Sequence, residues 1–274
     1  MSGIVSFNSN WLQYNGVVVG ASEYDPLNPL HLPAWTVRAR FSQGYTPAMG
    51  DERTLVDAQD NIWDITVTHS PSFVGLFYNN SSLQEVLGAN ATGIQAMNTM
   101  FKGCTHITTV PLFDTSSVTS ISGMFEGCTG LTSVPLFDTS SVVFMDSMFA
   151  NCSSLTSVPY FDTGSVTDIS SMFKRCLALT ASPLFDTSSV SNMASMFYEC
   201  YALTEIPLFD TSHVIQMYST FGLCRNVQTG ALALYQQAST QATPPANHSG
   251  TFWSTGADTI SGAAELAQIP SDWK

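Results

Sequence analysis

Six cysteines follow one another along this chain at a fixed interval of 24 residues. They are Cys104, Cys128, Cys152, Cys176, Cys200 and Cys224. Phenylalanine, proline and aspartate keep the same interval, in the series Phe101 to Phe221, Pro111 to Pro207 and Asp114 to Asp210. A fixed period of this length with apolar positions in every copy is typical of a chain in which each copy packs on its neighbours. The sequence therefore predicts a solenoid.

The repeating unit reads M-F-x-x-C-x-x-L-T-x-x-P-L-F-D-T-S-S-V-x-x-M-x-x. Its apolar residues step by three, three and one, as at Val118, Ile121, Met124 and Phe125. This spacing predicts a short helix, for which the polar run 114–117 supplies capping oxygens. Residues 107–112 predict a short strand, which Pro111 limits to three or four residues. We expect an α/β, leucine-rich-repeat-like solenoid of strand, turn and helix units, stacked about 4.8 Å apart.

The two ends of the chain differ from the array, and all five tryptophans lie there. Residues 1–70 contain strand-like alternation and predict a small β unit that serves as a cap and an attachment point. The array itself is expected over residues 71–229. Its first copy is degraded but recognisable from Leu76, Phe77, Asn80, Leu83, Ile94 and Met97. Residues 230–274 predict a C-terminal cap with helical segments at 230–241 and 262–268.

Composition and charge exclude some classes of function. Only 11% of the residues are charged and the formal net charge is −13, so a nucleic acid partner is not expected. Residues 1–10 lack the features of a secretory signal, and no apolar run of about 18 residues predicts membrane insertion. We expect a protein that stays inside a cell or that reaches the outside by assembly into a virus particle.

The repeat resembles the BspA-like leucine-rich repeat family, in its variant rich in D-T-S-x-V-x-x-M-x-x-M-F, across residues 77–228. Segments 32–41 and 230–237 look more like the branch encoded by gut bacteriophages than like secreted adhesins. The resemblance implies a non-enzymatic virion surface protein: a head fibre, decoration or host-adhesion protein. It would contact other virion proteins through residues 1–70, and a bacterial surface or mucosal protein or glycan through the repeats. The alternative is a bacterial cell-surface adhesin that binds host protein or glycan; homo-oligomers are compatible with either.

The cysteine and aspartate series each allow two interpretations. Stacked cysteines approach the distance range of disulfides, but parallel stacking separates their Cβ atoms too far, and Asn80 occupies the cysteine position in the first copy. Free, buried thiols are expected, and the absence of a CxxC pair argues against zinc. The aspartates could bind calcium, but the following Thr-Ser-Ser supplies local donors, which favours turn capping. We expect no metal, no cofactor and no catalytic residue, because the five histidines stand in no catalytic motif.

Positions that vary between copies are the candidate binding surface, since a residue that is free to vary on a fixed scaffold usually faces solvent. Aromatic residues beside charges favour recognition over ordinary surface. The candidates are Phe144, Lys174, Arg175, Tyr198, Tyr201 and Tyr218. The alternative is a set of scattered surface residues without a partner. The repeated series Phe113 to Phe209 is instead predicted to be core.

Overall fold

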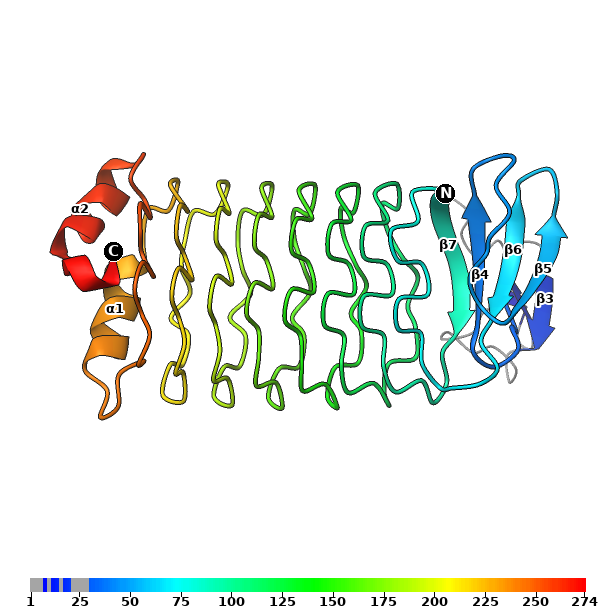
Figure 1. Cartoon of the computed structure of the whole chain (residues 1–274), viewed down its shortest axis with the longest axis horizontal. Helices are drawn as coiled ribbons and strands as arrows, with labels where there is room; N and C mark the ends of the chain where they lie inside the picture. The colour runs from blue at the N-terminus through cyan, green and yellow to red at the C-terminus, as the bar shows by residue number, and fades with distance from the viewer. Residues whose placement is uncertain (1–6, 9–10, 15–16, 21–29) are drawn as a thin grey trace.

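The computed structural model describes residues 7–8, 11–14, 17–20 and 30–274, and it is an elongated stack of coils with a sheet at one end and helices at the other (Figure 1). Three short strands come first: β1 (Phe7–Asn8), β2 (Trp11–Tyr14) and β3 (Val17–Gly20). A second antiparallel sheet has the order β5-β6-β4-β7. Its strands are β4 (Thr36–Phe41), β5 (Glu52–Asp57), β6 (Ile62–Thr66) and β7 (Leu83–Asn90). The chain ends with α1 (Ala231–Ser239), α2 (Ile260–Gln268) and the 3-10 helix η1 (Ser271–Trp273).

The four-stranded sheet covers the first coil and shares its core. Val37, Ala39 and Phe41 alternate along β4 and are buried, as a half-covered strand requires. The Phe41 ring lies 6.2 Å from the ring of Phe77 in the first coil. The strand β7 follows that coil in sequence and pairs with β4, so sheet and solenoid are interleaved between residues 71 and 90.

The segments predicted to be helical form successive turns instead. Within residues 71–229, all of which the structure describes, there is no helix, so the prediction of strand, turn and helix units is wrong. Backbone N–H groups in these segments alternate in direction. Met124 N and Glu126 N donate three residues back, to Ile121 O and Gly123 O, whereas Phe125 N donates to Met148 O of the next coil.

Left-handed residues explain why no helix forms. Gly123 and Gly127 have φ of 60° and 73°, and the equivalent Ser147 and Asn151 have φ of 57° and 63°. A left-handed residue at every fourth position produces a chain of tight turns, because it reverses the backbone where a helix would continue. Consecutive turns also bring every third or fourth side chain to one side, which explains the helix-like apolar spacing.

The parallel pairing between coils also lies elsewhere than predicted. Bridges connect Ala96, Ser120, Phe144, Asp168, Asn192 and Gln216 in series, at the start of the segment predicted to be helical. Residues 107–112, predicted to be a strand, form none in the structure, and this part of the coils contributes few ladder bonds, such as Thr132 N to Thr108 O at 2.9 Å. The repeated proline explains the difference, because it removes a donor from this segment in every coil.

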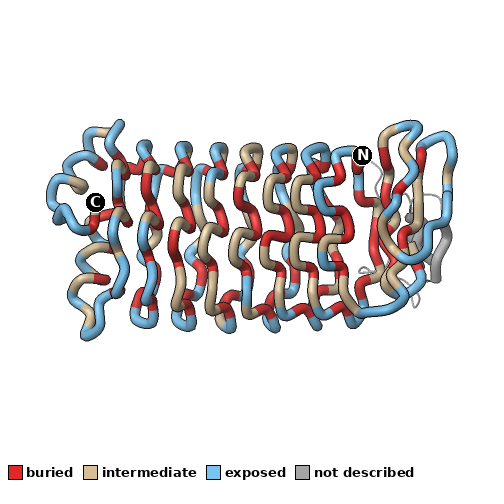
Figure 2. The backbone as a smooth tube through the Cα atoms, in the orientation of Figure 1, coloured by how far each residue is buried: buried red, intermediate tan, exposed pale blue. Residues whose placement is uncertain are grey.

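Two columns of phenylalanine form the core of the solenoid. Consecutive rings from Phe77 to Phe221 stack with centroids 5.3–5.7 Å apart. The second column, Phe113 to Phe209, is buried against the first, which confirms the prediction that it is core. The buried positions recur at the same place in every coil (Figure 2).

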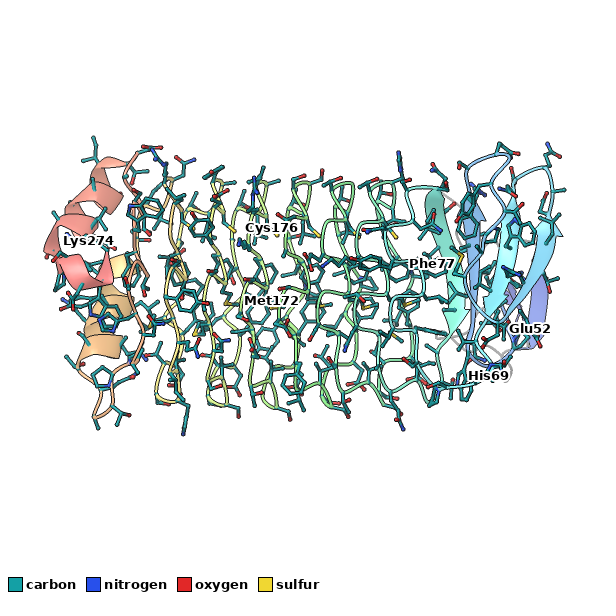
Figure 3. All side chains as sticks on the ribbon, viewed as in Figure 1. Glu52, His69, Phe77, Met172, Cys176 and Lys274 are labelled. Carbon is teal, nitrogen blue, oxygen red and sulfur yellow. The ribbon has the colours of Figure 1, made fainter. Side chains whose placement is uncertain are left out.

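The cysteines form a third buried column. All six are free and buried, as predicted, and each thiol donates to a phenylalanine carbonyl of the preceding coil, as from Cys128 Sγ to Phe101 O at 2.9 Å. Figure 3 labels Cys176 and Met172 within the stack. Burial raises the pKa of Cys104, Cys176 and Cys224 to about 12. In the first copy, Asn80 accepts bonds from Ser82 N and Leu83 N, so it fills the same turn.

A further coil, which the sequence did not reveal, closes the C-terminal end. Asn247 pairs with Gln216, and the Phe252 ring lies 6.1 Å from Phe221. Thr255 replaces cysteine, because its hydroxyl donates to Phe221 O at 2.7 Å. The spacing rises from 24 to 31 residues between Phe221 and Phe252 because α1 is inserted. The helix α1 lies within the predicted segment 230–241, and α2 overlaps the predicted segment 262–268 but begins at Ile260.

Replacing Phe173 by alanine is expected to lower the free energy of unfolding by about 3 to 5 kcal/mol, because a fully buried stacked ring is lost. The matched variant Phe144→Ala should cost far less, since Phe144 is 48% exposed. Chemical denaturation of both variants measures the difference. Equal losses would show that the assignment of the buried face is wrong.

The cysteines are expected to resist alkylation in the native protein at about pH 8, because burial raises their pKa and excludes the reagent. After denaturation without a reductant, all six should react. Intact-mass measurement counts the labels; fewer than six labels on the denatured chain would reveal disulfides and contradict the free-thiol assignment.

Candidate ligand-binding surface

The repeated P-L-F-D-T segment places a leucine or tyrosine outward in successive coils. Side chains alternate along this segment as they do in an extended chain: Phe137 and Thr139 are buried, whereas Leu136 and Asp138 are exposed. The equivalent side chains in later coils repeat the pattern. Exposed fractions are 59% for Leu136, 58% for Tyr160, 56% for Leu184 and 55% for Leu208. These four residues define the apolar stripe.

A row of carboxylates runs beside the apolar stripe, two residues further along each coil. We call Asp138, Asp162, Asp186 and Asp210 the aspartate row. In each of them Oδ1 accepts a bond from the backbone N–H two residues later, at 2.8–3.1 Å. The hydroxyl and the N–H of Ser140 lower the pKa of Asp138, and Ser188 does the same for Asp186. These bonds confirm the turn-capping role predicted for the aspartates.

Buried threonines connect the segments that carry the two rows. Thr139 donates to the Asp162 carbonyl at 2.7 Å, Thr163 to Asp186 at 2.8 Å and Thr187 to Asp210 at 2.7 Å. Each bond joins one coil to the next directly beneath an aspartate. The spacing of the carboxylates is therefore fixed by the scaffold before any ligand arrives.

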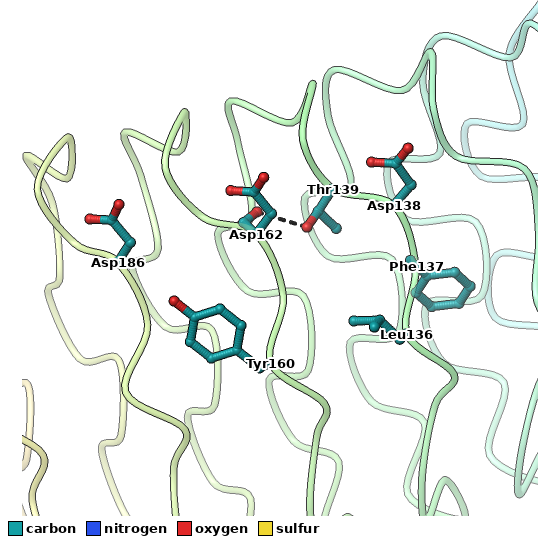
Figure 4. Close-up of a pocket in the computed structure, with 7 residues that line it drawn as sticks. All are labelled: Leu136, Phe137, Asp138, Thr139, Tyr160, Asp162 and Asp186. Atoms are coloured by element: carbon teal, nitrogen blue, oxygen red, sulfur yellow. Dashed lines mark hydrogen bonds between the residues drawn. The ribbon is translucent and has the colours of Figure 1, made fainter.

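The surface is hollowed between the two rows. A groove of about 510 Å³ is lined by Leu136, Phe137, Asp138, Thr139, Tyr160, Asp162 and Asp186. Figure 4 shows the three carboxylates on successive coils, with Tyr160 and Leu136 beside them. Gly164 stands where other copies have serine, and a Cβ there would lie 3.5 Å from Asp162 Oδ1 and 3.6 Å from Asp186 Oδ2. Glycine at this position therefore leaves the space beside these two carboxylates free of a side chain.

A second hollow of about 350 Å³ continues along the solenoid. Its lining is Ala181, Ser182, Leu184, Glu205, Pro207 and Leu208. No lysine or arginine lines either hollow. Together the two hollows contain four acidic side chains and all four residues of the apolar stripe. The surface combines exposed apolar area with negative charge, which suits a ligand that is apolar on one side and cationic beside it.

Four of the six candidates from the sequence form a separate cluster. Lys174 Nζ lies 5.7 Å from the centroid of Tyr198, and Arg175 Nε lies 3.2 Å from Glu199 Oε2. Partial burial, reinforced by Glu199 and Tyr201, raises the pKa of Tyr198. Tyr201 is 41% exposed. The charges in this cluster have partners within it, which reduces what they can offer a ligand.

The other two candidates lie on the ladder side of the coils. Phe144 pairs with Ser120 and Asp168 in the bridge series and is half-exposed. Tyr218 is 39% exposed, and its carbonyl accepts a bond from Ser195 N. The structure does not join Phe144 or Tyr218 to the four clustered residues.

Two tryptophans of the segment predicted to be the attachment point, residues 1–70, have hydrogen-bond partners within the chain. Trp35 Nε1 donates to Thr92 O at 3.0 Å, and Trp63 Nε1 donates to Asn61 Oδ1 at 2.9 Å. The side chain of Trp11 lies outside the described residues. A more exposed apolar pair in this region is Leu55 and Val56 on the edge strand β5, 45% and 44% exposed.

Across the described parts of the chain, no three His, Cys, Asp or Glu side chains are grouped so that they could hold a metal ion. Neither α1 nor α2, the two α-helices found among the described residues, has the length and apolar character needed to cross a membrane.

A stack of short coils that presents one repeated outer surface defines a repeat solenoid of the leucine-rich type. The family described as "Mycoplasma protein of unknown function, DUF285" matches residues 71–183 and 130–235, more than half of the chain. The chain belongs to this family. None of the curated proteins compared with it is significantly similar in sequence.

Two solved structures of leucine-rich repeat proteins are similar to parts of the chain. One, from Bacteroides ovatus, has 21% identity and a TM-score of 0.27, and the match covers 40% of this chain and 34% of that protein. The other, from T. pallidum, has 18% identity and a TM-score of 0.33, with 54% and 78% covered. The chain thus spans about a third of the B. ovatus protein.

The aspartate row is expected to make the protein less stable at acidic pH. Because hydrogen bonds lower the folded pKa of Asp138, Asp186 and Asp210, their stabilisation is present above the unfolded pKa and is lost as pH falls through the folded pKa. Replacing all three by serine, which caps without titrating, should reduce the fall in Tm between about pH 5 and pH 2. Thermal scans check this, and parallel curves for both proteins would contradict it.

Proposed function

We propose that this protein is a non-enzymatic binding scaffold on the surface of a bacteriophage particle, where it serves as a head fibre, decoration or host-adhesion protein. The observation that carries the binding role is the apolar stripe beside the aspartate row. Large apolar side chains are exposed at the same place on successive coils, which costs free energy unless a partner covers them. The rigid spacing of the rows supports recognition without reorganisation.

The repeat family supports a binding role over catalysis. Solenoids of this type present extended surfaces, because each coil adds one more copy of the same outer residues. In this chain, the three aspartates of the groove are engaged in turn capping, and no histidine or cysteine lines either hollow. The arrangement can hold a cationic or apolar group, and it places no histidine beside a hydroxyl group to activate it.

The placement on a phage particle is supported by segments 32–41 and 230–237, which resemble those of the phage-encoded branch. Attachment to other virion proteins is proposed through β5. This strand lies at the edge of its sheet, and an edge strand with exposed apolar side chains is suited to pair with another chain. Recognition of the bacterial or mucosal partner is proposed through the coils.

The second candidate is an adhesin on a bacterial surface. The family description names Mycoplasma, a bacterium, and this favours a cellular setting for the same scaffold. The binding surface would be the same, but the attached end would contact the cell envelope. The two candidates differ in location, not in the chemistry of recognition.

Immunogold labelling with an antibody to the coils separates the candidates. Labelling of purified phage particles is expected; labelling confined to bacterial cells would support the adhesin. The variant Leu55→Glu with Val56→Glu should reduce incorporation into particles, because charge on the β5 edge disfavours pairing. Phe144→Ser is the control and should be incorporated normally. Undiminished incorporation of the β5 variant would contradict attachment through this strand.

A further inference from the structure

We infer that the apolar stripe and the aspartate row together form a docking site for an amphipathic helix with a basic flank, lying along the long axis of the solenoid. The inference rests on the proposed binding role and adds the chemistry and shape of the partner. It concerns residues 136–210, a stretch that the structure describes completely.

The repeat distance of the surface matches that of an α-helix. Stacked phenylalanines of successive coils are 5.3–5.7 Å apart, and bridged strands are spaced by about 4.8 Å. A helix advances 5.4 Å per turn, so one apolar residue per turn can meet one coil. An extended peptide repeats its side chains on one face every ~6.7 Å, and it would leave register within three coils.

The width of the surface also suits a helix. Leu136 and Asp138 are two residues apart in an extended segment, which places the two rows about 6.7 Å from one another. A helix of about 10 Å diameter covers both rows. Its apolar face would lie on Leu136, Tyr160 and Leu184, and its flank would reach Asp138, Asp162 and Asp186.

The negative charge of the groove favours a helix with basic residues on its flank. The chain has 21 acidic and 8 basic residues, and the groove contains three carboxylates and no basic side chain. Hydrogen bonds hold the pKa of Asp138 and Asp186 below the usual range, so these groups remain negative at neutral pH. Lysine or arginine on the helix, one turn apart, would face one carboxylate per coil.

The same charges disfavour a second copy of this chain as the occupant. Two copies meeting stripe to stripe would bring two aspartate rows together, and adjacent like charges repel. The groove of about 510 Å³ is lined by residues of three successive coils, and the second hollow, of about 350 Å³, is lined by residues of the third coil and of the one after it. A linear occupant that spans several coils fits this layout.

The probe is a synthetic 18-residue helical peptide with leucine on one face at helical spacing and lysine along the adjoining flank. Binding to the full-length protein is measured by fluorescence anisotropy at low and high salt. Two control peptides of matched length carry glutamate in place of lysine, or leucine at alternate positions with proline to prevent a helix. The helical basic peptide is expected to bind at least about tenfold more tightly than either control.

Three protein variants test the two rows separately. Leu136→Ser with Tyr160→Ser and Leu184→Ser removes three of the four residues of the stripe, and these exposed residues can change without loss of the fold. Asp138→Asn with Asp162→Asn and Asp186→Asn removes the charge but keeps the cap. Both should weaken binding at least about tenfold, and the asparagine variant should also abolish its salt dependence. Phe144→Ser lies outside the groove and should bind like the wild type.

Several results would overturn the inference. Equal binding of the extended peptide would exclude a helix, and equal binding of the glutamate peptide would exclude charge selection. Concentration-dependent dimers lost in the stripe variant would show that a second copy occupies the site. Because particle labelling is independent of the peptide, failure of peptide binding leaves the proposed surface location intact, and failure of labelling leaves the docking site intact.

Discussion

Backbone hydrogen bonds that alternate in direction hold the coils together. Phe125 N donates to the next coil, whereas Met124 N and Glu126 N close turns within their own. Every second donor in these segments is therefore satisfied only when a neighbouring coil is present, and an isolated coil would leave buried donors unpaired. The stack needs a different structure at each end, which the four-stranded sheet and the coil at residues 247–255 provide.

The period of 24 residues was enough to predict stacking and the buried columns, because residues at one period share one environment. Phe173, Phe185 and Cys176 are all buried as expected. The local conformation was not predictable from apolar spacing alone, since successive turns and a helix both repeat every three to four residues. The distinguishing signal was the pair Gly123 and Gly127, whose left-handed φ excludes a helix.

The apolar stripe, which is the candidate binding surface in the structure, is not among the candidates from the sequence for a related reason. Variable positions were expected to carry recognition, and four of them do meet around Tyr198, but their charges have partners there. The leucine of P-L-F-D repeats in most copies, so a search for variable positions does not select it. Alternation in an extended segment cannot bury both Leu136 and Phe137, and this rule alone would have placed the leucine outside.

In the proposed docking site, repetition itself would supply specificity. Each coil between Leu136 and Asp210 contributes one exposed apolar group and one carboxylate, and threonine bonds such as Thr139 to Asp162 fix their spacing. A partner gains one apolar and one ionic contact per coil only if its own repeat matches the coil distance. Mismatch accumulates with length, so a longer array discriminates more sharply between helical and extended partners. In this arrangement, the number of coils would determine how well helical and extended partners are distinguished. The residues of each coil would determine which apolar and ionic contacts the partner makes.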